Sequence, residues 1–98
     1  MRGNRLDRNQ QEIVRTLRRI PGLSVRGLNR EKDGLGDILV GFRGRNFMFE
    51  IKDPLKPPSA TKLTSDEKEF HRLWQGQIDI AFTAHEIVDL IQGYIYKE

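Results

Sequence analysis

Hydrophobic and polar residues alternate along two neighbouring segments in the middle of the chain. Residues 37–42 and residues 47–52 both show the period of two that is typical of half-buried β-strands. The segment between them contains Gly44-Arg45, and glycine suits the first central position of a tight turn that needs a positive φ. With this pair as the turn, the two segments form a hairpin in which Asp37 pairs with Lys52.

The alternation gives this hairpin one fully apolar face. That face carries Ile38, Val40, Phe42, Phe47, Phe49 and Ile51. The opposite face carries Asp37, Leu39, Gly41, Met48, Glu50 and Lys52. All the charged side chains therefore lie on one face, at the end away from the turn, so that two carboxylates and a lysine converge at the open end of a sheet.

This set of side chains suits phosphodiester hydrolysis with a divalent metal. Mg²⁺ prefers a few carboxylate oxygens together with water and substrate phosphate, and Asp37 and Glu50 would supply the carboxylates. The backbone carbonyl of Ile51 would add a neutral oxygen, and Lys52 would orient the attacking water or stabilise charge on the phosphate. The alternative is an ordinary surface patch, since strands often carry Glu and Lys outward. Asp37 in register, opposite an apolar face, favours the catalytic interpretation.

The remaining elements follow from helical spacing and capping signals. The pattern predicts a helix over residues 6–19, a short strand over 24–28, a helix from Thr64 to about Trp74, a strand over 77–82 and a last helix that begins after Thr83. Thr64 and Glu67, and again Thr83 and Glu86, have the spacing of a capping box. The order is helix, three strands, helix, strand, helix, and the helical crossover allows the last strand to join the sheet in parallel.

Composition bounds the class of protein. With 98 residues, 37% hydrophobic and 32% charged, we expect one globular domain over residues 1–98 with a modest core. No stretch approaches the roughly 18 apolar residues of a membrane span. The first eight residues lack the apolar segment of a signal peptide, and the chain has no cysteine, so we expect a cytoplasmic protein.

The charge is concentrated in the first third of the chain. Residues 1–30 contain eight Arg and two acids, a net charge of +6, whereas the remainder has a net charge of −3. Arginine forks onto phosphate oxygens, so this third is either a nucleic-acid contact or a solvated basic helix face. The candidate DNA-binding residues are Arg2, Arg5 and Arg8, with Lys56 and Lys62 beside the proline-rich loop of residues 53–62, which we expect to border the mouth of the site.

Two further polar residues interrupt apolar stripes. Gln10 lies on the stripe of the first helix and is expected to point at the site, unless it occupies an edge position. Glu67 lies between Leu63 and Phe70 at helical spacing, on the stripe we expect to be buried, where a carboxylate needs a partner or a metal. It would line the cleft beside Lys52, or serve only as the capping acid of its helix.

The chain resembles the VRR-Nuc branch of the PD-(D/E)XK nuclease superfamily, and in particular its small stand-alone phage and bacterial members. The resemblance covers nearly the whole chain, through residues 36–41, residues 50–53, and residues 62–64 with Glu67, Phe70, His71 and Trp74. Asp37, Glu50 and Lys52 match the three central motif positions, and Gln10 resembles the glutamine of the first helix. The chain departs from the family at Glu67, where glutamine is common, and in its first-helix acid, for which Asp7 or Glu12 would substitute.

The resemblance implies a restriction-endonuclease-like α/β fold, with an αβββαβα core whose mixed central sheet is flanked by helices. It also implies a DNA endonuclease dependent on Mg²⁺ or Mn²⁺, acting as a homodimer on branched DNA such as four-way (Holliday) junctions. A non-catalytic nucleic-acid-binding module that uses the N-terminal arginines is the main alternative, and a hydrolase of small phosphoesters is another. For the dimer interface, late apolar residues are candidates, unless they simply cover the sheet: Ile87, Leu90, Ile91, Tyr94, Ile95 and Tyr96.

Overall fold

The predicted order of helices and strands is confirmed. The computed structural model describes residues 8–28 and 36–97. Its elements are α1 (Arg8–Arg18), β1 (Ser24–Gly27), β2 (Ile38–Phe42), β3 (Arg45–Ile51), a short 3₁₀ helix η1 (Pro58–Ala60), α2 (Ser65–Leu73), β4 (Asp79–Ala81) and α3 (Ala84–Tyr96). Only η1, inside the proline-rich loop, was not expected.

The strands form one mixed sheet in the order β1-β2-β3-β4. The pairs β1–β2 and β2–β3 are antiparallel, and β4 runs parallel to β3. The parallel pairing follows from the long crossover through α2, because a tight turn joins only antiparallel strands. The predicted α/β class with a mixed sheet is therefore confirmed.

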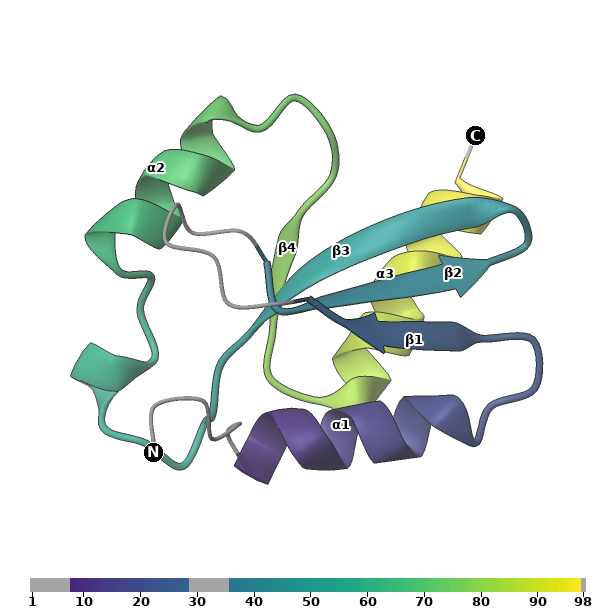
Figure 1. Ribbon diagram of the computed structural model, residues 1–98, viewed down its shortest axis with the longest axis horizontal. Helices are drawn as coiled ribbons and strands as arrows, with labels where there is room; N and C mark the ends of the chain where they lie inside the picture. Colours follow the sequence, from purple (N-terminus) through teal and green to yellow (C-terminus); the bar gives the residue numbers. More distant parts are fainter. Residues whose placement is uncertain (1–7, 29–35, 98) are drawn as a thin grey trace.

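One face of the sheet carries the hydrophobic core. Helices α1 and α3 lie against it, whereas α2 stands apart beyond one end of the strands (Figure 1). The core consists of Ile13, Leu17, Val25, Ile38, Val40, Phe47, Phe49, Ile51, Ala81, Ile87 and Ile91. The alternating side chains of β2 and β3 supply five of these residues, as their period of two predicts. The core thus fixes the strands whose other face carries the charged residues.

The predicted register of the hairpin is wrong by two residues. The turn is Arg43-Gly44, with φ of 54° and 77°, rather than Gly44-Arg45, so Phe42 pairs with Arg45 and Ile38 with Phe49. Two positive φ angles in succession are those of a type I′ turn, whose twist matches the flanking strands. Because side chains repeat every two residues, a shift of two leaves the faces unchanged. The ladder begins with Ile38 and Phe49, so Asp37 lies one residue before it and the predicted pair of Asp37 with Lys52 does not form.

Gly44 is expected to be the critical residue of this turn. Gly44→Ala should destabilise the protein by about 1–2 kcal/mol, because an L side chain at positive φ is strained. The matched control is Gly93→Ala in the interior of α3, where a Cβ meets nothing within 4 Å. That change should stabilise the helix by about 0.5–1 kcal/mol. Chemical denaturation measures both, and a neutral Gly44→Ala would contradict the turn assignment.

The helix starts agree with the capping signals in most details. Thr64 and Glu67 form the expected capping box at the start of α2. At α3, the Thr83 side chain accepts from the Glu86 amide, but the Glu86 carboxylate accepts from the Phe82 amide rather than completing the box. The predicted helix over residues 6–19 is α1, of which residues 6 and 7 lie outside the described residues.

Two expectations about helix faces need correction. Helix α2 contains no buried residue, so the buried stripe predicted around Glu67 is only half-buried, since α2 stands off the core. The buried residues of α3, Ile87 and Ile91, pack in the core of the single chain. Of the six suggested interface residues only Tyr96 is exposed, which is the alternative in which they cover the sheet. Within the described residues, no helix has the length and apolar character that crossing a membrane requires.

Candidate functional site

Asp37, directly before β2, and Glu50 of β3 lie at the end of the hairpin away from its turn. Glu50 is 2% exposed and Asp37 is half-buried. The Asp37 amide donates to the Phe49 carbonyl at 2.9 Å, and the Ile51 amide donates to Asp37 Oδ2 at 2.8 Å. These two bonds tie the Asp37 backbone and side chain to β3, so both carboxylates are held by the strand pairing itself.

Gly36 allows this close approach. A Cβ at Gly36 would lie 2.8 Å from Met48 Cγ, 3.1 Å from Ile78 Cδ1 and 3.2 Å from the Phe49 carbonyl oxygen. The last of these contacts is to backbone, which cannot rotate away. The glycine before Asp37 is therefore required for the chain to pass close enough to β3 to place the carboxylate.

Lys52 provides the positive charge of the site. Its Nζ donates to Glu67 Oε1 at 2.9 Å and lies 4.0 Å from Glu50 Oε2. Lys52 extends from the end of β3 and Glu67 from the first turn of α2, so this contact joins the sheet to the helix that stands apart from it. The same Glu67 oxygen accepts from the Thr64 amide at 2.9 Å. Glu67 is thus both the capping acid and the partner of Lys52.

The three carboxylates perturb one another. Burial raises the pKa of Glu50 to about 10, and the negative charge of Asp37 and the neighbouring Glu67 add to the effect. Burial also raises the pKa of Asp37, against the opposing effect of the Ile51 amide. For Glu67 the effect of burial is outweighed by the hydrogen bonds from Lys52 and the Thr64 amide, so its pKa is lowered. Without a bound cation, burial therefore favours the protonated forms of Glu50 and Asp37.

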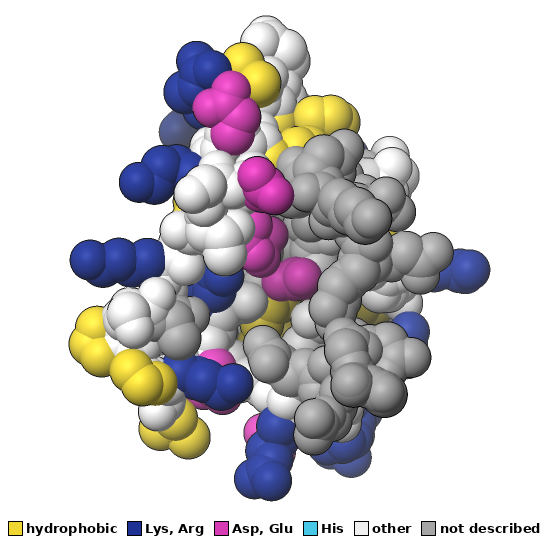
Figure 2. Space-filling view, turned by 60° about the vertical axis from the view of Figure 1, so that its left-hand side comes forward, with side chains coloured by type: hydrophobic (Ala, Val, Ile, Leu, Met, Phe, Trp, Pro, Cys, Tyr) yellow, Lys and Arg dark blue, Asp and Glu magenta, His cyan; other side chains and the backbone are white. Residues whose placement is uncertain are grey.

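The surface toward α2 carries charged side chains of both signs. Acidic side chains gather in the middle of the face toward α2, and Lys and Arg side chains stand around them (Figure 2). Among the described residues, Oε1 of Glu50 is a buried oxygen with no hydrogen-bond partner. A buried polar atom without a partner is costly, and such atoms are concentrated at functional sites.

These carboxylates fit a hydrated Mg²⁺ or Mn²⁺. No group of three His, Cys, Asp or Glu residues in the described part of the chain is arranged to hold a metal ion. Mg²⁺ does not require such a group, because it usually retains several waters and takes one or two carboxylates. A cation beside Glu50 and Asp37 would favour the ionised form of both carboxyls and would give Glu50 Oε1 a partner. The predicted ligands Asp37 and Glu50 are brought together, and Ile51 lies directly beside them.

The structure leaves other predicted site residues at a distance or undescribed. Gln10 is buried on α1, but no hydrogen bond joins it to Asp37, Glu50 or Lys52 among the described residues. Lys56 and Lys62 are exposed in the loop after β3, and Arg8 is exposed at the start of α1. The other candidates, Arg2, Arg5 and Asp7, lie outside the described residues, and Glu12 is exposed on α1.

Sequence reasoning missed Asn9, which fixes α1 to the site. Its Nδ2 donates to the Lys52 carbonyl at 2.8 Å and to the Phe82 carbonyl at 3.1 Å. The first turn of α1 is thereby bonded to the ends of β3 and β4. An asparagine on a half-polar helix gives no local signal of this role, because both partners are distant in sequence.

His71 is closer to the site than its isolated position in the sequence suggests. It is half-buried on α2, and burial lowers its pKa while the charges of Glu67 and Asp79 oppose this change. Its Nε2 is buried without a hydrogen-bond partner among the described residues. His85, by contrast, is exposed and lies 3.3 Å from Asp89.

Comparison of the chain with protein-family models, with curated proteins and with solved structures found no match.

Proposed function

We propose that the protein is a metal-dependent DNA endonuclease of the restriction-endonuclease-like fold, similar to the VRR-Nuc nucleases. The observation that carries the proposal is Glu50, a buried carboxyl whose pKa is raised to about 10 and whose Oε1 has no hydrogen-bond partner among the described residues. The charge of Asp37 contributes to this raised pKa, and Lys52 Nζ lies 4.0 Å from Glu50 Oε2. Perturbed carboxyls in such an arrangement are typical of functional sites.

The residues divide the chemistry between them. Asp37 and Glu50 would hold Mg²⁺ or Mn²⁺, and the metal, when bound, polarises the phosphate and lowers the pKa of a bound water. Lys52 is a donor whose side chain is 12% exposed. It would donate to a phosphate oxygen or to the attacking water, and so stabilise the charge that develops in the transition state. Glu67 keeps the Lys52 ammonium beside the carboxylates.

Charge and resemblance support DNA as the substrate. Arg15 and Arg18 are exposed on α1, and Arg19 is exposed directly after it. Asn9 bonds this helix to the end of β3. The order of helices and strands is the one that the resemblance implies. A four-way junction is the substrate proposed from the resemblance, and two symmetric cuts require two sites, which a two-fold homodimer supplies.

A non-catalytic nucleic-acid-binding module is the second candidate, because α1 presents several exposed arginines whether or not the site reacts. The two candidates differ in what the acids do. A binding module has no need of two carboxylates facing a phosphate, since they repel it. Incubating the protein with labelled linear, single-stranded, flap and four-way DNA, with and without Mn²⁺, tests the proposal. Metal-dependent products support the endonuclease, and binding without products in every case would refute it.

Lys52→Ala is expected to reduce cleavage by about a hundredfold or more, because it removes the donor aimed at developing charge. Metal should still bind, since both carboxylates remain, and calorimetry with Mn²⁺ measures this. The matched control is Lys68→Ala, which removes an exposed lysine of α2. If Lys52→Ala cleaves DNA at the wild-type rate, Lys52 only balances the charge of Glu67.

A further inference from the structure

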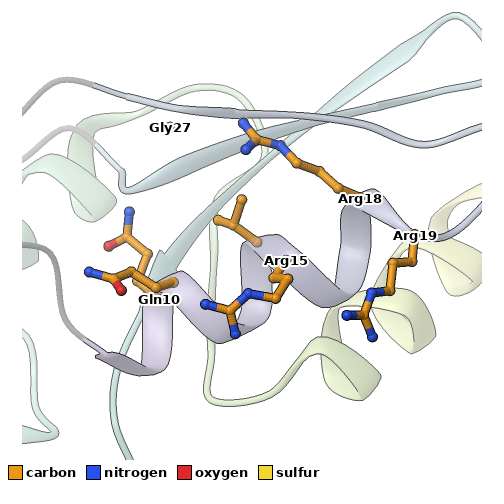
Figure 3. Close-up of a pocket in the computed structure, with 7 residues that line it drawn as sticks. Gln10, Arg15, Arg18, Arg19 and Gly27 are labelled. Atoms are coloured by element: carbon orange, nitrogen blue, oxygen red, sulfur yellow. The ribbon is translucent and has the colours of Figure 1, made fainter.

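A groove runs along α1 on the side of β1. Its volume is about 560 Å³, and the described residues that line it come from α1 and from Arg19 directly after α1, with Gly27 of β1 on the opposite wall. Arg15, Arg18 and Arg19 line it, together with Gln10 at the end nearest the site, and Figure 3 shows these side chains around the space. The groove is distinct from the cluster of Asp37, Glu50 and Lys52.

The charge in this groove is unbalanced. None of the described residues that line it is acidic. Neither Arg15 nor Arg19 makes an ion pair within residues 8–28 and 36–97. Nη2 of Arg18 donates to the Val25 carbonyl at 3.0 Å, which holds this guanidinium toward β1 while other N–H groups remain. Arg15 and Arg18 are three residues apart on α1, a spacing at which like charges repel, and a bound anion would reduce that repulsion.

The groove leads away from the catalytic cluster. The bonds from Asn9 to the Lys52 and Phe82 carbonyls hold the first turn of α1 at the end of β3, and Gln10 is the next residue. From Gln10 to Arg18 the helix rises about 12 Å. This distance is several times the 3.4 Å or so of duplex axis that each phosphate of one DNA strand occupies. The groove therefore matches a segment of backbone, not a single phosphate.

We propose that this groove binds the phosphodiester backbone of the nucleic acid on one side of the bond that is cut. The identity of the ligand rests on the proposed function. Arginine forks grip phosphate oxygens, and Gln10 lies at the site end of the same groove. Contacts of this kind fix the register of the nucleic acid and carry no base sequence. Arg15, Arg18 and Arg19 are thus positioning residues for the substrate.

The first test removes two of these charges. Arg15→Gln combined with Arg19→Gln should weaken binding of a fluorescent DNA duplex in EDTA about tenfold or more, and reduce the log–log salt slope by about 2. Anisotropy across a NaCl series measures both. The matched control is Arg43→Gln combined with Lys97→Gln, which removes two charges near the end of α3. Arg43 contacts the ring of Tyr96 there, and neither Arg43 nor Lys97 is among the residues that line the groove. This control should bind like wild type.

The second test adds a charge on the opposite wall. A Cβ added at Gly27 meets nothing within 4 Å, so a side chain can be introduced at this position without a clash at its first atom. Gly27→Glu should bind DNA severalfold or more weakly than Gly27→Gln, which adds a side chain of equal size without the charge. This pair keeps the test valid if the double arginine variant fails to fold.

The outcomes separate the groove from the endonuclease proposal. If the groove variants bind duplex DNA with wild-type affinity and slope, the groove assignment is wrong, whether or not the protein cuts DNA. If wild type binds no DNA, the assignment is also wrong. If groove variants lose binding and wild type does not cleave with Mg²⁺ or Mn²⁺, the groove assignment stands and the endonuclease proposal fails.

Discussion

Replacing Glu50 by Gln is expected to abolish cleavage while making the metal-free protein more stable. A carboxyl with a pKa of about 10 carries a proton at neutral pH, so the neutral amide has nearly the shape and charge of the group that it replaces. In the unfolded chain the carboxyl ionises near 4.5. At pH 7 the carboxyl must therefore take up a proton when the chain folds. This lowers the free energy of unfolding of wild type by roughly 1–3 kcal/mol relative to a side chain that does not titrate.

The activity of the same variant should fall at least a hundredfold, because the amide removes an anionic metal ligand. DNA binding in EDTA should be unchanged, since the protonated carboxyl and the amide that replaces it are both neutral. Thermal unfolding in EDTA should show a midpoint several degrees higher, at about 4–8 °C for each kcal/mol in a domain of this size. The control is Glu69→Gln, an exposed acid paired with Arg72. Full activity in Glu50→Gln would remove Glu50 from the site.

The second large effect is a decrease in the stability of the metal-free protein between pH 7 and pH 9. Because the folded-state pKa of Glu50 is above its unfolded value, the folded state holds a proton that the unfolded state has lost. Stability is therefore greatest below the unfolded pKa and falls as pH rises toward about 10. The expected slope reaches about 1.4 kcal/mol per pH unit. The lowered pKa values of Glu67 and His71 act at more acidic pH, below this window.

Urea denaturation in EDTA at several pH values measures this slope. Glu50→Gln should show a much smaller slope over the same range, because its amide does not titrate. Adding Mg²⁺ should stabilise wild type more at high pH than at low pH, since the ligand must lose its proton to bind. Parallel pH profiles for wild type and Glu50→Gln would show that Glu50 is ionised in the folded protein.

The faces of the hairpin could be predicted from the sequence, but its register could not. Alternation places Ile38, Val40, Phe47 and Phe49 together whichever nearby turn forms, because a shift of two residues preserves the faces. The position of the turn depends on contacts of the Arg43 side chain as well as on local preference. Arg43 takes a positive φ although it is not glycine, and the cation–π contacts of its guanidinium with Phe42 and Tyr96 accompany that conformation. Tyr96 is distant in sequence, so local turn preferences do not include this contact.

Some residues of the candidate site could likewise be predicted from the sequence and others could not. Asp37, Glu50 and Lys52 could be found because all three lie in the two segments that alternate like strands, residues 37–42 and 47–52. The period of two in these segments determines their common face. The role of Asn9 could not, because its partners are carbonyls at the ends of β3 and β4. Gln10 was predicted to point at the site, yet it lines the groove that leads from it. Helical spacing gives the buried side of α1 but not its position along the sheet.

The most direct test of the endonuclease proposal is cleavage of labelled DNA by wild type and by Asp37→Asn, purified in parallel. Asp37→Asn keeps the size of the side chain and an oxygen that accepts from the Ile51 amide, so the fold should be retained. Wild type should cut in Mg²⁺ or Mn²⁺ and not in EDTA, and Asp37→Asn should bind the same DNA without cutting it. Equal cleavage by both proteins, or no cleavage of linear, flap or four-way DNA by folded wild type that binds it, would contradict the account.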